Sequence, residues 1–311
     1  MFYKEIPHKL AFINGKSTID IYFKVKGAYR LFAAEGATLT EDHYRLCSKE
    51  TLYIQSDDHA AAEKNLDSHI MNILTDSTVE TRHKAELVFS FSLNSLREVF
   101  QGPNAKTIDD LQRISNSIAN SILKDTGIVG HVMEMTSLDH YIIQHSVKTG
   151  TFGLALTINL YGDRIDDHDL PDLCTAFFLH DIGMTKVPKT VLDKEEPHTP
   201  GDWDVIRNHP QWGHEKLHRI GKLTEKAKDI VLYHHERCNG SGYPFKKTRD
   251  EIPIYAKICA IADTFESLTS RRPFRPSKTP FEALKIMMGE MANEFEPELF
   301  RSFIMLLGQG R

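Results

Sequence analysis

Imidazole and carboxylate side chains gather in the second half of this 311-residue chain, where eleven of its sixteen histidines follow Gly130. His180 and Asp181 come directly after one apolar run, and His234 and His235 come directly after another. Imidazole nitrogens and carboxylate oxygens are ligands of divalent transition metals. Both pairs are therefore candidate metal ligands, each expected at the end of a buried helix.

These features also have simpler explanations. An isolated His-Asp dipeptide at a helix end is more often a cap or an ion pair than a metal site, and two adjacent histidines can be an ordinary surface pair. Asp263 follows the apolar residues 258–262 and is expected at the end of a helix. An unpaired carboxylate buried there would be strongly destabilising, and a cation would satisfy it.

His145 and His209 complete a set of five imidazoles and two carboxylates that contains no thiolate. Such a set suits iron, manganese or nickel better than a structural zinc site, although affinity order alone does not exclude zinc. Seven ligands are too many for one ion, so we expect two ions bridged by Asp181. One would take His145, His180, Asp181 and Asp263, and the other Asp181, His209, His234 and His235.

A dinuclear centre with a bridging water is suited to phosphate-ester hydrolysis, because the ions lower the pKa of the water and hold the attacking and leaving oxygens. Phosphodiester cleavage is therefore the predicted reaction class.

The composition excludes several other classes of protein. A formal net charge of -5 gives no overall attraction to polymeric nucleic acid or to an anionic membrane surface. The four cysteines are far apart and form no C-x-x-C pair, which indicates reduced thiols. The opening residues hold no signal-peptide core, and no run of eighteen apolar residues occurs. We expect a cytoplasmic protein with no membrane contact.

The elements that position these residues fall into three predicted parts. Residues 1–75 form a small α/β regulatory or interaction domain, residues 76–125 are connecting helices, and residues 126–311 form an all-α domain. The fold class is thus α+β overall. Within the last two parts, apolar residues recur every three or four positions, as amphipathic helices require.

The N-terminal part is expected to hold a β-hairpin over residues 19–33, where apolar residues alternate from Ile19 to Val25 and Lys26-Gly27 then turns the chain into Tyr29 to Ala33. A strand is expected at residues 52–54. Thr40 would cap a short helix through Cys47, and Asp57 or Asp58 would start a helix reaching about Leu74.

The order of the motifs resembles the HD-GYP family, bacterial HD-superfamily phosphodiesterases that hydrolyse cyclic di-GMP. The resemblance spans about Leu138 to Phe303. It rests on His145-Ser146, His180-Asp181-Ile182-Gly183, His209-Pro210, the stretch 234–244 that ends in Gly242-Tyr243-Pro244, and the stretch 261–275.

The resemblance implies that residues 126–311 are a metal-dependent phosphodiesterase domain that yields linear pGpG, GMP or both, and the departures at Met184 and Phe274 imply slow turnover. It makes the seven His and Asp residues above metal ligands, with His180 and Asp181 catalytic, and it favours iron, then manganese. Substrate contacts would come from Tyr243, Glu266, Arg272 and Arg275. A diguanylate cyclase or a second copy of the chain is the expected protein partner.

Three positions depart from the family pattern. Met184 stands where the family has a lysine, Phe274 stands where it usually has a tyrosine, and Tyr141 stands where members with a third metal have a glutamate. The alternative function is therefore a catalytically impaired cyclic di-GMP receptor or adaptor. A hydrolase acting on another nucleotide would explain the metals but not the Gly-Tyr-Pro stretch.

Overall fold

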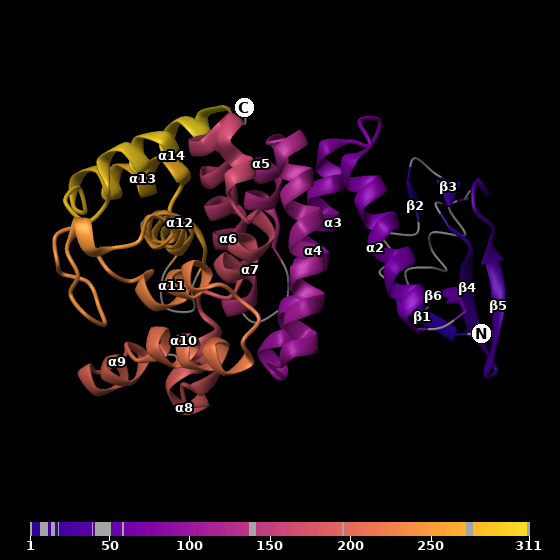
Figure 1. Ribbon diagram of the computed structural model, residues 1–311, viewed down its shortest axis with the longest axis horizontal. Helices are drawn as coiled ribbons and strands as arrows, with labels where there is room; N and C mark the ends of the chain where they lie inside the picture. The colour runs from indigo at the N-terminus through magenta and orange to yellow at the C-terminus, as the bar shows by residue number, and fades with distance from the viewer. Residues whose placement is uncertain are drawn as a thin grey trace. The chain divides into compact units, whose positions relative to one another are not determined.

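The computed structural model describes residues 2–6, 12–13, 16–17, 19–38, 40, 51–57, 59–136, 141–194, 196–271 and 276–309 (Figure 1). The chain divides into two compact units, Met1–Leu87 and Val88–Arg311. Across the described residues, no helix is long and apolar enough to cross a membrane.

The first unit is built on an antiparallel sheet with the strand order β1-β6-β4-β5. Its strands are β1 (Phe2–Ile6), β4 (Ile21–Val25), β5 (Ala28–Ala33) and β6 (Leu52–Ser56). A second pair joins β2 (Phe12–Ile13) to β3 (Lys16–Ser17), and helix α2 (His59–Thr75) follows the sheet in sequence.

The predicted hairpin is β4 and β5, and the predicted strand at 52–54 is β6. Lys26 and Gly27 have φ values of 48° and 85°, the left-handed conformation that a two-residue hairpin turn requires. Strand β1 was not predicted, because its apolar residues are interrupted by Lys4 and Glu5. The helix expected from Thr40 through Cys47 falls on residues 41–47, outside the described part of the chain.

The second unit is helical, which confirms the predicted fold class. Helix α3 (Thr81–Gln101) crosses into it from the first unit. The other helices are α4 (Ala105–Lys124), α5 (Gly127–Glu134), α6 (Tyr141–Tyr161), α7 (Leu170–Phe178), α8 (Lys189–Leu192), α9 (Pro200–Ile206), α10 (His209–Ile220), α11 (Glu225–Tyr233), α12 (Ile254–Thr269), α13 (Pro280–Gly289) and α14 (Pro297–Gln309), with short 3-10 turns η2 (Gly162–Asp167), η3 (Ile182–Lys186) and η4 (Arg249–Glu251).

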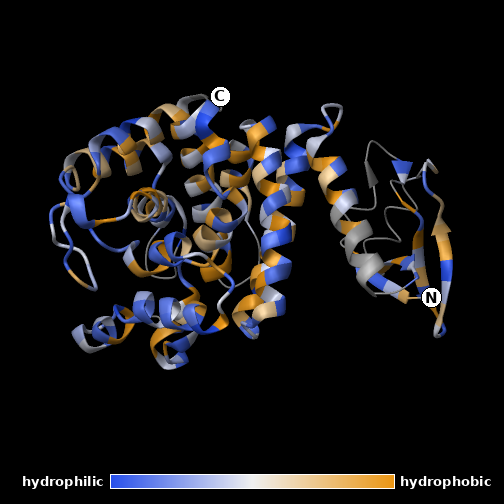
Figure 2. Cartoon of the chain, viewed as in Figure 1, coloured by the Kyte–Doolittle hydropathy of each residue, from blue (hydrophilic) through white to orange (hydrophobic). Residues whose placement is uncertain are grey.

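Helix α6 lies at the centre of this unit and packs against α7, α12 and α14. Phe152, Phe265 and Phe303 meet edge to face there, with ring centroids 5.1 to 5.9 Å apart. Helix α4 shows the alternating apolar and polar colours of an amphipathic helix in Figure 2, and it buries Ile108 and Leu111. This core fixes the helices whose ends carry the polar site.

Candidate metal centre

Five segments bring the seven predicted ligand residues together. His145 lies in the first turns of α6, and His180 and Asp181 lie between α7 and η3. The remaining residues are His209, the first residue of α10, His234 and His235 at the end of α11, and Asp263 in α12. The prediction that Asp263 ends its helix is wrong. The buried run continues past it, so α12 extends to Thr269.

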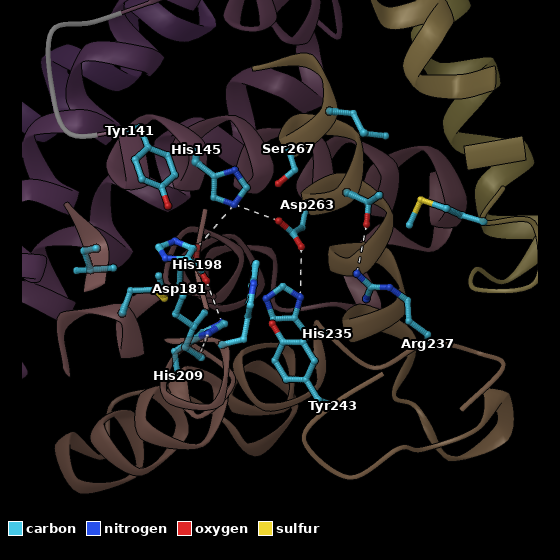
Figure 3. A pocket seen from close by; sticks show the side chains of 17 residues that line it. Tyr141, His145, Asp181, His198, His209, His235, Arg237, Tyr243, Asp263 and Ser267 are labelled. Carbon is cyan, nitrogen blue, oxygen red and sulfur yellow. Dashed lines mark hydrogen bonds and ion pairs between the residues drawn. The ribbon is translucent and has the colours of Figure 1, made fainter. Parts of the chain in front are cut away.

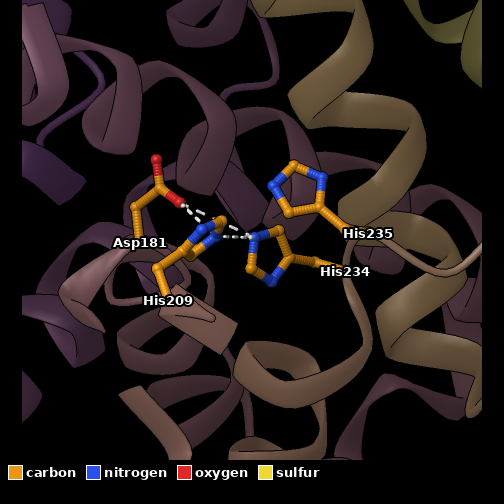
Figure 4. A group of neighbouring side chains, drawn as sticks. All are labelled: Asp181, His209, His234 and His235. Atoms are coloured by element: carbon orange, nitrogen blue, oxygen red, sulfur yellow. Dashed lines mark hydrogen bonds and ion pairs between the residues drawn. The ribbon is translucent and has the colours of Figure 1, made fainter. Parts of the chain in front are cut away.

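These side chains form two clusters, and within each cluster the potential ligand atoms lie within 4.8 Å of one another. Asp181, His209, His234 and His235 make one cluster (Figure 4), and His145, His180 and Asp263 make the other. This is the division expected for two ions. The assignment of these residues as ligands stays a prediction.

The carboxylate of Asp181 faces both clusters. Its Oδ1 lies 3.1 Å from His209 Nε2 and 3.6 Å from His234 Nε2. Its Oδ2 lies 3.7 Å from His145 Nε2 and 3.7 Å from His180 Nε2. One oxygen is thus presented to each cluster, the arrangement that a bridging carboxylate needs.

The backbone fixes the orientation of three imidazoles in the same way. The Nδ1 atoms of His180, His209 and His234 lie 2.9, 2.8 and 2.9 Å from the carbonyl oxygen three residues earlier in the chain. A carbonyl only accepts hydrogen bonds, so each Nδ1 carries the proton and each Nε2 keeps a free lone pair. Metal-binding histidines are commonly oriented by such outer contacts.

His145 is oriented by a carboxylate instead of a carbonyl. Its Nδ1 contacts Oε2 of Glu266, whose other oxygen accepts from the Ser270 hydroxyl. Burial alone would lower the pKa of His145, but Glu266 and Asp263 raise it to about 10. A divalent cation bound at Nε2 would therefore displace a proton.

The donor set itself fits cations. His180 Nε2 lies 3.2 Å from His145 Nε2, and His209 Nε2 lies 3.1 Å from His234 Nε2. Because His209 and His234 each carry their proton on Nδ1, both of their Nε2 atoms are acceptors and would repel one another. A shared cation removes this conflict, which supports a metal ion at the cluster of His209 and His234, held by nitrogen and oxygen ligands.

The charge states also suit metal binding. Burial lowers the pKa of His180 to about 4, against the opposing charge of Asp181. Burial lowers the pKa of His235 well below its usual value. Burial would raise the pKa of Asp181 and Asp263, but the surrounding imidazoles hold both below their usual range. At neutral pH the site thus offers His180 and His235 as neutral imidazoles and Asp181 and Asp263 as carboxylates, the forms that bind metals, whereas His145 holds a proton that a cation must displace.

A pocket of about 320 Å³ opens over both clusters (Figure 3). Its polar wall holds Asp181, His209, His235 and Asp263, and its apolar wall includes Met184. The other residues around it are Tyr141, His145, Leu192, His198, Trp203, Ile206, Arg237, Tyr243, Thr264, Ser267, Leu268 and Met291.

Tyr243 lies against the centre with its ring stacked on His235, the centroids 4.6 Å apart. Burial raises its pKa, and the charges of Asp263 and Asp181 add to this effect, so the phenol stays protonated and can donate. Gly242 allows this placement, because a Cβ there would lie only 2.5 Å from the carbonyl oxygen of His235. The following loop is held by buried Glu236, which accepts from the amides of Phe245 and Lys247.

Other predicted substrate contacts are placed differently or not at all. Glu266 is buried and points at His145, and it does not line the pocket over Asp181. The predicted contacts Arg272 and Arg275, and the departure Phe274, lie outside the described residues. Met184 and Tyr141 both line the pocket, so two of the three departures bear directly on it.

Sequence reasoning missed several pocket residues, including His198, Trp203 and Arg237. Arg237 donates to the carbonyls of His234 and Glu236 and pairs with Glu294, so it also holds the end of α11. The only sequence signal for Trp203 was its place after the Thr199-Pro200 helix start, which predicts a helix but not a pocket.

Comparisons with known proteins agree with the predicted family resemblance. Residues 153–299 match the family model of the HD domain. The chain is 28% identical over 228 residues to the cyclic di-GMP phosphodiesterase PA4108 of Pseudomonas aeruginosa, covering 73% of this chain and 53% of that protein. It is 34% identical over 142 residues to the 3'3'-cGAMP-specific phosphodiesterase 2 of Vibrio cholerae, covering 45% and 27%. The chain thus spans about half or less of the length of these relatives.

A solved structure shares the whole fold. Bd1817, an HDG"Y"P protein from Bdellovibrio bacteriovorus, matches with a TM-score of 0.66 and 20% identity, covering 99% of this chain and 100% of that chain. The predicted resemblance is confirmed: residues 153–299 match the HD-domain family model, and the chain shares its fold with Bd1817.

Proposed function

We propose that this chain is a metal-dependent phosphodiesterase that hydrolyses cyclic di-GMP to linear pGpG, GMP or both. The observation that carries the proposal is Asp181, whose two oxygens face two separate groups of metal-binding side chains. The similarity to phosphodiesterases that act on cyclic dinucleotides supports the choice of substrate.

The seven His and Asp residues of the two clusters would hold two divalent ions, iron first and manganese next. When bound, such ions supply a water of lowered pKa and stabilise charge on the phosphate. The protein keeps the Nε2 atoms of His180, His209 and His234 unprotonated by using each Nδ1 as a donor. The Tyr243 hydroxyl lies beside this centre as a neutral donor for a phosphate or ribose oxygen.

The apolar wall at Met184 should make turnover slow. Met184 is buried and packs with Val187 and Ile206, so no ammonium faces the phosphate at this position. Losing one donor that acts in the transition state costs about 10²- to 10³-fold in rate. The buried Met184 also supports the second candidate function. In that function the chain is a receptor that binds cyclic di-GMP without turnover and signals to a diguanylate cyclase or to a second copy of the chain.

Anaerobic purification, metal analysis and product analysis after incubation with cyclic di-GMP test the proposal. We expect linear dinucleotide or GMP to form with the metal-loaded protein and not with its Asp181→Ala variant. Parallel incubation with 3'3'-cGAMP measures substrate preference. Tight binding without product would overturn the enzyme and favour the receptor, and absence of binding to either nucleotide would contradict both.

A further inference from the structure

Trp203 is an exposed indole on the wall of the metal pocket. Its side chain is 43% exposed, although it lines the same pocket as Asp181 and Tyr243. The second tryptophan, Trp212, is half-buried against the apolar cluster of Met184 and lies under Lys186 Nζ, which is 5.5 Å from its ring. A large aromatic surface kept open to a polar site has no role in the core of this fold.

The local structure holds Trp203 in place. Thr199 and Asp202 cap the start of α9 reciprocally, with Asp202 N 3.2 Å from Thr199 Oγ1 and Thr199 N 2.7 Å from Asp202 Oδ2. Lys194 Nζ lies 2.6 Å from the same carboxylate. The His198 ring stands edge-on to the indole, with centroids 5.6 Å apart and planes at 85°. The backbone that carries the indole is thus held before any ligand arrives, and His198 supports one edge of the ring, which lowers the entropic cost of binding.

The lining of the pocket combines two kinds of side chain. One part consists of the carboxylates and imidazoles of the candidate metal centre, where a phosphodiester would bind. The apolar part of the lining includes Met184, Leu192 and Ile206, which pack together, and Trp203, with His198 beside the indole. A ligand that fits both parts has an anionic group joined to a flat apolar ring, which describes a nucleotide.

We propose that Trp203, supported by His198, is the stacking surface for one nucleobase of the cyclic dinucleotide. This inference rests on the proposed function and adds a residue that determines which phosphodiesters are accepted. Base stacking on an aromatic side chain contributes about 1–3 kcal/mol and tolerates any base, because every base has a π-face. Trp203 therefore selects nucleotides over base-free phosphates and does not distinguish guanine from adenine.

Fluorescence gives a test that does not depend on turnover. In a Trp212→Phe variant, Trp203 is the one remaining tryptophan of the sequence. Cyclic di-GMP and 3'3'-cGAMP should both quench its emission, and inorganic phosphate should not. Equal quenching by phosphate and by the dinucleotides, or no quenching at saturating dinucleotide, would overturn the proposal.

Binding and kinetics complete the test in the otherwise unmodified protein. Trp203→Ala should raise Kd and KM for cyclic di-GMP about 5- to 150-fold, the change that 1–3 kcal/mol represents, with metal content unchanged. Trp203→Phe should recover most of the loss. Phe281→Ala removes another exposed aromatic ring, which does not line this pocket, and should change neither constant.

The outcomes separate this inference from the proposed function. If Trp203→Ala leaves hydrolysis and binding unchanged, the stacking role of Trp203 is overturned and the proposed function is not. Binding that depends on Trp203 without any product keeps the stacking surface and overturns the enzyme. A parent protein that binds neither dinucleotide overturns both.

Discussion

At the scale of single residues, outer contacts set the orientation of the imidazoles in the candidate metal centre. Three histidines donate to backbone carbonyls, so their orientation follows from helix geometry. His145 depends instead on the carboxylate of Glu266, a side chain that can be replaced without altering the backbone. Glu266 was predicted to contact substrate, and the structure points it at His145.

Glu266→Gln should weaken binding of the ion held by His145, His180 and Asp263. The substitution removes the charge that orients His145, and loss of such an outer contact typically costs about 10- to 100-fold in metal affinity. Competitive chelator titration measures the affinity of each ion. Ser270→Ala, which removes the other side-chain partner of Glu266, serves as a matched control and should have a smaller effect. Equal affinity in Glu266→Gln and the parent would contradict the orienting role.

The metal-free protein should be most stable near pH 6.5. His180 has a folded pKa of about 4 against an ordinary value of 6.5, so the unfolded chain binds the extra proton and stability falls as the pH drops from 6.5 towards 4. His145 has a folded pKa of about 10, so the folded chain holds the extra proton and stability falls as the pH rises from 6.5 to 10.

Urea unfolding of chelator-treated protein between pH 4 and pH 10 measures the free energy of unfolding, and so both its fall towards acid pH and its fall towards alkaline pH. In Glu266→Gln the fall in stability towards alkaline pH should become smaller, because one of the two carboxylates that raise the pKa of His145 has lost its charge. An unchanged fall towards alkaline pH in that variant would show that another group causes it.

At the scale of elements, the sequence indicated the ends of α7 and α11 well, because each buried apolar run stops at a polar pair. It failed at Asp263, since α12 stays buried on both sides of that carboxylate and periodicity alone does not separate a charged residue inside a helix from one at its end. It also failed at β1, whose edge position tolerates charged residues. The place of Trp203 in the pocket could not be predicted, because the other residues that line the pocket come from distant parts of the sequence.

Gly183 is the close contact that fixes α10 against η3. A Cβ at this position would lie 1.9 Å from the carbonyl oxygen of His209, and backbone at that distance must move. Gly183→Ala should therefore displace His209 and remove the ion of its cluster, as metal analysis of the folded variant would show. Gly289→Ala meets no atom within 4 Å and is the matched control. Two ions retained at full affinity in Gly183→Ala would contradict this packing argument.

At the scale of the whole molecule, every predicted ligand belongs to the second unit. The first unit, Met1–Leu87, contains none of the seven residues, and its predicted role in regulation or protein interaction stays a prediction. The candidate metal centre is therefore built entirely on segments of the second unit, namely α6, the α7–η3 turn, α10, α11 and α12.

A chain that begins at Thr81 should fold and bind the same ions as the full-length protein, because it keeps all of α3 and every candidate ligand. Circular dichroism would verify folding, and metal analysis would give the stoichiometry. A folded, metal-free product would show that the first unit supports the centre.

The bridging carboxylate of Asp181 is the central claim, and metal stoichiometry in matched preparations tests it most directly. Elemental analysis of anaerobically purified protein should find about two transition-metal ions per chain, one for each cluster that Asp181 faces. Asp181→Ala should lower the affinity of the protein for both ions, whereas His209→Ala should mainly lower its affinity for one ion. Loss of a single ion in Asp181→Ala, with the other held at its full affinity, would contradict the account.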